Sequence, residues 1–306
     1  MTYSIVARDP DTGSLGIAVQ SHFFGVGRIV PWAEPGVGAV ATQAFAEVSY
    51  GPLGLDLMRA GRSAPEALAQ LVQADPGADT RQVAMVDAGG NVAAHTGARC
   101  VAAAGDSAGD QVTAQANMVA HDSCWPAMVT AYTSASGGLA GRLLAALDAA
   151  ENEGGDVRGR QSAAILIVAR EPTPRPWESV LLDVRVDDHP DPVVEIARLV
   201  RYSDAYDLIG KALFSTGIVT GENPPSPDAA EEAARELDAA AAVLGENPEA
   251  AMWRAVVLAR AGRTDEARQA VTKLLRAHPQ VGEFVSRLPA AGLIPKGAEL
   301  VDPSSS

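Results

Sequence analysis

The sequence predicts an α+β fold in which antiparallel sheets are buried against helices. Segments with the alternation and composition of strands come in pairs, and amphipathic segments with helical spacing lie between those pairs. The order along the chain is strands, two helices, strands, two helices, strands and a helix. This order fits neither regular βαβ alternation nor a helical bundle, and it is typical of a layered α+β domain.

The first expected element is a β-hairpin at the start of the chain. Residues 2–8 ("TYSIVAR") and 15–21 ("LGIAVQS") are β-prone, and "DPDTGS" between them supplies Asp, Pro and Gly for a turn. A further short apolar run, "VGAVATQA" at residues 37–44, is predicted to be a strand.

The period of the apolar residues then changes and predicts two short helices, at residues 51–61 and 64–74. Pro65 occupies an allowed position in the first turn of the second helix. The next segment, residues 82–97, has two apolar runs around "DAGGN" and predicts a second hairpin. Residues 100–105 and 111–120 are predicted to be additional strands.

The rest of the main domain is predicted to hold two helices, two strands and a long helix, at residues 124–134, 138–152, 161–170, 179–188 and 191–214. The segment "TGENPPSPDAA" that follows is rich in Pro, Gly, Ser and Asn, as domain linkers are. We therefore predict a domain over residues 1–220 and a helical extension over residues 221–306.

The extension is alanine-rich and predicts three helices within residues 228–279. A helix, a short Asn-Pro turn, a second helix and "GRTDEA" resemble a tetratricopeptide arrangement, but only one and a fraction repeats fit. Because solenoids need about three repeats for stability, we expect a small helical appendage. The last residues, "VDPSSS", are expected to fray.

Composition excludes several classes of function. The formal net charge of the 306-residue chain is −14, which argues against nucleic acid and anionic membrane as partners. We find no signal peptide and no apolar run long enough to span a bilayer. Cys100 and Cys124 form neither a disulfide framework nor a zinc pattern, so we expect a reduced, cytoplasmic protein.

Thr2 is the first candidate for chemistry. Methionine is normally removed when the next residue is small, and Thr2 would then carry a hydroxyl and a free α-amine on adjacent carbons. With a reference pKa of about 7.7–8.0, that amine can take the hydroxyl proton near neutrality. N-terminal nucleophile (Ntn) hydrolases place such a residue on the first strand of a sheet, as the hairpin does here. Many proteins begin Met-Thr without this role, so the two residues alone are weak evidence, and the hairpin that follows them strengthens the case for a nucleophile.

A second candidate is "GDSAG" at residues 105–109, which satisfies the G-x-S-x-G nucleophile pattern with Ser107 as nucleophile. An acid and a histidine lie downstream at Asp187, Asp188 and His189. The sequence that follows is polar and then β-like, whereas a nucleophile elbow requires a helix there. A turn is therefore the favoured interpretation of "GDSAG".

Polar residues at strand ends and in loops supply further candidates. Gln115 and Asn117 share one face of a strand and could orient a substrate or stabilise an oxyanion. Arg158 and Arg160 lie in a glycine-rich turn that could hold a carboxylate. "RVDDHPDP" could bind a metal, or its Asp and Pro residues could cap the following helix. Because its possible ligand residues have no defined spacing, they are weak evidence for a metal, and we expect none. "GVGAVA" precedes a strand rather than a helix, so no dinucleotide cofactor is expected.

Several of these blocks together resemble the bacterial family catalogued as domain of unknown function 1028, which has an Ntn-hydrolase-like fold. They are "SIVARDPDTGSLGIAVQS", "VPWAEPGVGAVATQA", "YGPLGL", "RQVAMVDAGGNVAAHTG", "GGDVRGRQSAA" and "VDDHPDPV". The resemblance covers about residues 2–205. It implies a four-layer αββα sandwich and amide hydrolysis with Thr2 as nucleophile, but no particular substrate. Folds of this type often assemble, which allows for a homo-oligomer.

The sequence departs from the family pattern at several expected pocket walls. His22 follows Ser21 where a lysine is common, Glu47 and Val48 replace an Asn-Pro, and Asp106 replaces a histidine. No lysine occurs before Lys211, so we expect no cation beside the Thr2 amine.

The leading hypothesis is an Ntn-type amidohydrolase that acts on a small-molecule or peptide amide without a metal or cofactor. The expected catalytic residues are Thr2, Ser21, Gln115 and Asn117, and the expected substrate-binding residues are His22, Gln43, Arg160, Asp188 and His189. The alternative is a binding or scaffold protein that keeps the fold without the chemistry and recruits a partner through its C-terminal helices.

Overall fold

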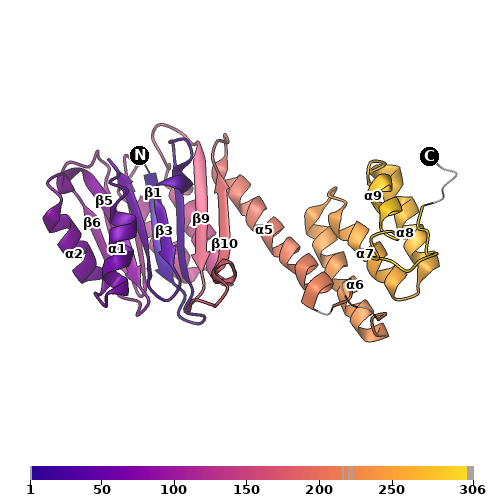
Figure 1. Cartoon of the computed structure of the whole chain (residues 1–306). Coiled ribbons are helices and arrows are strands. Elements are labelled where there is room, and N and C mark those ends of the chain that lie inside the picture. Colours follow the sequence, from indigo (N-terminus) through magenta and orange to yellow (C-terminus); the bar gives the residue numbers. More distant parts are fainter. Residues whose placement is uncertain (1, 216, 220, 222, 302–306) are drawn as a thin grey trace. The chain divides into compact units, whose positions relative to one another are not determined.

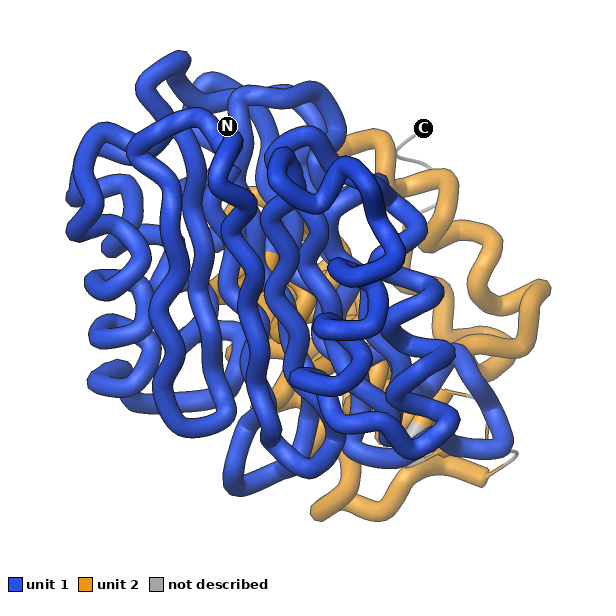
Figure 2. Tube along the Cα trace, turned by 90° about the vertical axis from the view of Figure 1, so that its left-hand side faces the viewer, with its two compact units in different colours: residues 1–199 blue, residues 200–306 orange. Residues whose placement is uncertain are grey.

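The chain forms two compact units, residues 1–199 and 200–306, which are coloured separately in Figure 2. The computed structural model describes residues 2–215, 217–219, 221 and 223–301. All but the first residue of the tail that was expected to fray lie outside this range. The division between the units falls within helix α5 (Pro192–Gly210).

Two antiparallel sheets form the centre of the first unit, as predicted from the paired strands. The larger has the order β10-β9-β2-β1-β8-β7, and the smaller has the order β3-β4-β5-β6. The strands are β1 (Thr2–Arg8), β2 (Leu15–Ser21), β3 (Pro31–Glu34), β4 (Gly38–Ala44), β5 (Arg81–Asp87), β6 (Val92–Thr96), β7 (Gly105–Gly109), β8 (Val112–Asn117), β9 (Ser162–Val168) and β10 (Val180–Val186). The predicted first hairpin is β1 and β2, with Thr2 opposite Ser21.

The two sheets pack face to face through a core of side chains that alternate along the strands. Val6 of β1, Ile17 and Val19 of β2, and Ala84 and Val86 of β5 are fully buried in this cluster. The residues with which they alternate face the helices, because successive strand residues point to opposite faces. Polar residues at the ends of the same strands therefore lie between the sheets as well.

Helices cover the two outer faces and complete a four-layer αββα sandwich, which confirms the predicted fold class (Figure 1). Helices α1 (Tyr50–Arg59) and α2 (Ala64–Ala74) pack on the smaller sheet, and α3 (Cys124–Ser134) and α4 (Leu139–Asn152) pack on the larger. The approach of α4 to β2 is close: a Cβ atom added to Gly16 would lie 2.8 Å from Leu143 Cδ1.

Three segments differ from the sequence-based expectations. Residues 100–104 form no strand, and the strand starts later, at "GDSAG", which was expected to be a turn. Strand β3 was not predicted; its four residues are too few to show a period. Short 3₁₀ helices lie at Val26–Arg28, Ala78–Thr80 and Pro176–Ser179, and the first of them borders the site described below.

The second unit is helical. After α5 come a π-helical segment (Lys211–Ser215), α6 (Pro227–Leu244), α7 (Glu249–Arg260), α8 (Thr264–Ala277) and α9 (Val281–Arg287), and the last of these was not predicted. Its core is built from small and branched residues such as Leu237, Val256 and Val271. Within the described part of the chain, no helix is long and apolar enough to cross a membrane.

Candidate active site

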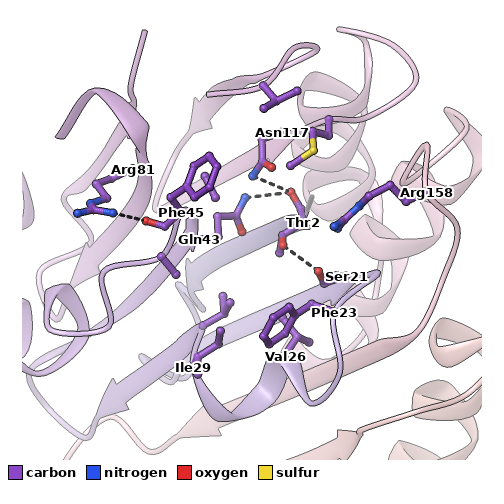
Figure 3. Close-up of a pocket in the computed structure, with 15 residues that line it drawn as sticks. Thr2, Ser21, Phe23, Val26, Ile29, Gln43, Phe45, Arg81, Asn117 and Arg158 are labelled. Carbon is purple, nitrogen blue, oxygen red and sulfur yellow. Dashed lines mark hydrogen bonds between the residues drawn. The ribbon is translucent and has the colours of Figure 1, made fainter. Parts of the chain in front are cut away.

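A pocket of about 620 Å³ opens where β1, β2, β4 and β8 end, at the edge of the space between the two sheets (Figure 3). Most of its wall is apolar, and its polar residues are few, as is usual for small-molecule sites. The lining residues are Thr2, Ser21, Phe23, Val26, Ile29, Val30, Gln43, Ala44, Phe45, Ala46, Arg81, Val101, Asn117, Met118 and Arg158.

Thr2 lies in this pocket at the start of β1, an internal strand of the larger sheet. It pairs with Ser21 of β2 on one side and with Asn117 of β8 on the other. The two hydroxyl oxygens, Thr2 Oγ1 and Ser21 Oγ, are 2.9 Å apart, and Ser21 is fully buried while Thr2 is 7% exposed. Thr2 thus presents its hydroxyl to the pocket, held at hydrogen-bond distance by a second, buried hydroxyl.

A network of buried amide side chains fixes the backbone at Thr2. Gln43 Nε2 and Asn117 Nδ2 donate to the Thr2 carbonyl oxygen at 3.1 and 3.4 Å. Both amides also donate to Gln82 Oε1, each at 2.8 Å. The network thus joins β1 and β8 of one sheet to β4 and β5 of the other, directly below the pocket.

Gln82 determines how these amides are oriented. Its Nε2 donates to the carbonyl oxygens of Ala116 and Gly105 at 2.8 and 3.1 Å. Since a carbonyl oxygen only accepts, the NH₂ group of Gln82 must face them and its Oε1 must face Gln43 and Asn117. The Asn117 NH₂ is therefore turned toward Gln82 and Thr2. Asn117 Oδ1 is buried and has no hydrogen-bond partner among the described residues.

Left-handed backbone conformations occur beside two of these amides. Ala44 follows Gln43 and has φ 67°, and Met118 follows Asn117 and has φ 54°. Such values are uncommon for residues other than glycine, and they concentrate at functional sites where the surrounding structure enforces them. At both positions the left-handed residue lies where a strand ends, and the backbone there changes direction beside the pocket.

Arg158 brings a positive charge to the pocket. Its side chain points toward Thr2 in Figure 3, and it is 39% exposed, whereas its ion-pair partner Asp156 is fully buried. Asp156 accepts from Arg158 Nη2 at 3.3 Å and from the His22 backbone N–H at 2.9 Å. The expectation of no cation beside Thr2 is therefore wrong, because it was drawn from the positions of the lysines alone and did not connect the loop arginines with Thr2.

Of the other expected site residues, only Gln43 lines the pocket. Gln115 lies deeper between the sheets and donates to Ser4 Oγ and the Ala41 carbonyl. His22 is half-buried and is not among the lining residues; its backbone N–H donates to Asp156 at 2.9 Å. The remaining expected residues, Arg160, Asp188 and His189, are not among the lining residues: Arg160 pairs with Glu151, Asp188 accepts from Gln161, and His189 Nδ1 accepts from the Asp191 N–H at the start of α5.

The alternative nucleophile Ser107 lies in the middle of β7, and a further strand follows it instead of a helix. The strained strand-to-helix turn that exposes the nucleophile of a G-x-S-x-G hydrolase is therefore missing here. Among the described residues, no group of three His, Cys, Asp or Glu side chains is placed to hold a metal ion.

Sequence reasoning missed Gln82, and of the two loop arginines that it named it placed Arg160, not Arg158, among the expected site residues. Gln82 has a signal: it alternates with Ala84 and Val86, and a single amide on an otherwise apolar strand face indicates a buried hydrogen-bond network. Arg158 has none, because a non-periodic loop does not reveal which of its two arginines points into a pocket.

Comparisons with known proteins agree with this fold. A family model described as "Family of unknown function (DUF1028)" matches residues 2–196. The crystal structure of protein SPO2555 from Silicibacter pomeroyi, which carries the same family model, is similar with a TM-score of 0.59 and 31% sequence identity, covering 65% of this chain and 88% of that one. No curated protein matches the chain. The chain thus belongs to the DUF1028 family of unknown function.

Proposed function

We propose that the protein is a hydrolase of amide bonds that uses Thr2 as an N-terminal nucleophile. The observation that supports this most strongly is the Thr2–Ser21 hydroxyl pair: the two oxygens are 2.9 Å apart, and Thr2, the first residue of β1, lines a largely apolar pocket. The four-layer sandwich supports it too, because Ntn hydrolases carry their N-terminal nucleophile on the first strand of a sheet. A nucleophile at that place can use its own α-amine as the base.

In the proposed reaction, removal of Met1 frees the α-amine of Thr2. The amine takes the hydroxyl proton while Thr2 Oγ1 attacks the carbonyl carbon of the amide. The same proton then passes to the leaving nitrogen, the C–N bond breaks, and an ester to Thr2 remains. Water, activated by the amine, attacks this ester and releases the acid, which restores the threonine.

The neighbouring residues have distinct positions for this chemistry. Ser21 Oγ holds the Thr2 hydroxyl toward the pocket, and the amides of Gln43 and Asn117 hold its carbonyl. Asn117 Oδ1 offers a buried acceptor on the residue that pairs with Thr2, suited to an N–H of the free amine. The positive charge of Arg158 disfavours protonation of a nearby amine and so favours its basic form.

The direct test is mass spectrometry of the purified protein before and after reaction with an acyl β-lactone, which esterifies activated hydroxyls. We expect an intact mass that lacks Met1, and one added acyl group on the tryptic peptide Thr2–Arg8 ("TYSIVAR"). Complete retention of Met1 would rule out the free-amine mechanism. A protein without Met1 that acquires no label at Thr2 would favour the alternative, a binding protein that keeps the fold.

The two thiols should not interfere with this labelling in the folded protein. Burial raises the pKa of Cys124 to about 12 and also raises the pKa of Cys100. At pH 8 a thiol with a pKa of 12 is ionised in about one molecule in ten thousand, and only the thiolate is a good nucleophile. We therefore expect iodoacetamide to alkylate Cys124 slowly at pH 8 and rapidly after unfolding in urea. Equal rates in both states would contradict the burial of this thiol.

A further inference from the structure

Resting on the proposed function, we propose that the substrate is an N-acyl amino acid: an apolar acyl chain joined by an amide to a group that carries a free carboxylate. Arg158 binds the carboxylate, and the apolar wall of the pocket binds the acyl chain. The reaction then consumes water and yields a carboxylic acid and an amino acid, with the acyl group carried on Thr2 Oγ1 in between.

The apolar wall contains large side chains that are open to solvent. Phe23, Phe45 and Val101 are 48%, 61% and 48% exposed, although all three line the pocket. Phe23 and Phe45, together with Val26 and Ile29, surround the space in front of Thr2 (Figure 3). Exposed aromatic and branched side chains gathered around a cavity are a binding surface for an apolar group, because covering them removes apolar area from water.

The charge on the pocket wall is positive. Among the described residues that line it, the charged side chains are Arg81 and Arg158, and none is Asp or Glu. The Arg81 side chain is held by Asp75 at 3.0 Å and by the Phe45 carbonyl at 2.7 Å, so it shapes the backbone that carries Phe45. Arg158 is the more exposed of the two, and it is the arginine that points toward Thr2 (Figure 3).

Asp156 prepares Arg158 for this role. Its fully buried carboxylate accepts from the Arg158 backbone N–H at 2.8 Å and contacts the guanidinium through Nε and Nη2. The contacts hold one edge of the planar guanidinium, which has five N–H donors in a fixed geometry that matches a carboxylate. Because this side chain is already positioned, less conformational entropy is lost when it binds an anion.

The order of the groups along the pocket selects the class of amide. Figure 3 shows Arg158 on one side of Thr2 and Phe45 on the other. A bound amide whose carbonyl carbon is at Thr2 Oγ1 therefore has its leaving nitrogen and carboxylate toward Arg158 and its acyl chain toward Phe45. This assignment makes the guanidinium a specificity-determining group that binds the leaving amino acid.

The test compares N-hexanoylglycine with N-hexanoylglycinamide, which have the same acyl chain and differ only in the charge of the leaving group. We expect the wild-type protein to hydrolyse the acid with a higher kcat/KM than the amide. Arg158→Met should lower kcat/KM for the acid about ten- to a hundredfold more than for the glycinamide, because only the acid loses a charged hydrogen-bonded contact, whereas a change in the basicity of the Thr2 amine affects both compounds alike. Arg158→Lys should show a smaller loss. The exposed Arg175→Met, which removes the same charge elsewhere, should show none.

Three further measurements keep the outcomes separate. Thermal unfolding checks that the variants fold, and Asp156→Asn/Arg158→Met removes the buried carboxylate together with its partner. Calorimetric titration of the Thr2→Ala protein measures binding without turnover. Tighter binding of the acid than of the glycinamide there would support the inference even if Thr2 were not the nucleophile. Equal binding of the two compounds, no binding of either, or an equal loss for both in Arg158→Met would overturn it.

Discussion

Thr2→Ala should abolish turnover of amide substrates, with a loss in kcat of at least about a thousandfold. The substitution removes the hydroxyl that lies 2.9 Å from Ser21 Oγ, while the small residue at position 2 still permits removal of Met1. The amine, the pocket wall and the amides below it all remain. Steady-state kinetics on purified protein of verified mass measures the loss.

Thr2→Ser provides the matched comparison, because serine keeps both the hydroxyl and the amine. It loses only the methyl group that restricts rotation about the Cα–Cβ bond of a β-branched residue. We expect the serine variant to retain turnover within about tenfold of wild type, because its hydroxyl is still present and is only less firmly oriented toward the substrate. Wild-type turnover by Thr2→Ala would exclude Thr2 as nucleophile and leave the pocket as a binding site.

Much of the fold could be predicted because its elements are long and periodic. The first hairpin has both signals, alternation in its strands and an Asp-Pro-Gly turn, and it forms Thr2–Arg8 and Leu15–Ser21 as predicted. The helix at Ala64–Ala74 also begins where the sequence indicates: Ser63 and Glu66 form a capping box and Pro65 occupies the first turn. By contrast, "CVAAAG" is apolar without alternation, so composition alone could not distinguish a strand from an extended loop.

The candidate site was predictable only in part, because it depends on how the two sheets pack. Thr2 and Ser21 could be placed opposite each other from the predicted hairpin, whereas the pairing of Thr2 with Asn117 was not predicted. Gln43 belongs to the other sheet, and nothing in its own strand shows that it meets the Thr2 carbonyl. Asp188 and His189 follow a strand end as well, but this end leads into α5: His189 Nδ1 accepts from the Asp191 N–H there, and Asp188 accepts from Gln161. Strand ends alone therefore do not identify the pocket.

Gln82→Met tests whether the buried amides fix the position of the two sheets relative to each other at the site. Methionine has a similar volume, so it fills the space without the hydrogen bonds. The Gln43 and Asn117 amides then lose their shared acceptor, and the carbonyls of Ala116 and Gly105 lose a donor. Buried polar groups left without partners cost about 1–3 kcal/mol each, with partial relaxation. We expect the free energy of unfolding to fall by on the order of 3–5 kcal/mol.

Urea denaturation measures this loss, and Gln70→Met on the exposed face of α2 is the matched control, expected within about 0.5 kcal/mol of wild type. The site should respond along with stability, because Gln82 orients the same Asn117 and Gln43 amides that hold the Thr2 carbonyl. Labelling of Thr2 should therefore slow in Gln82→Met under conditions where the protein is still folded. A loss of stability no larger than that of Gln70→Met would mean that these hydrogen bonds do not position Thr2, and that the apolar core alone aligns the sheets.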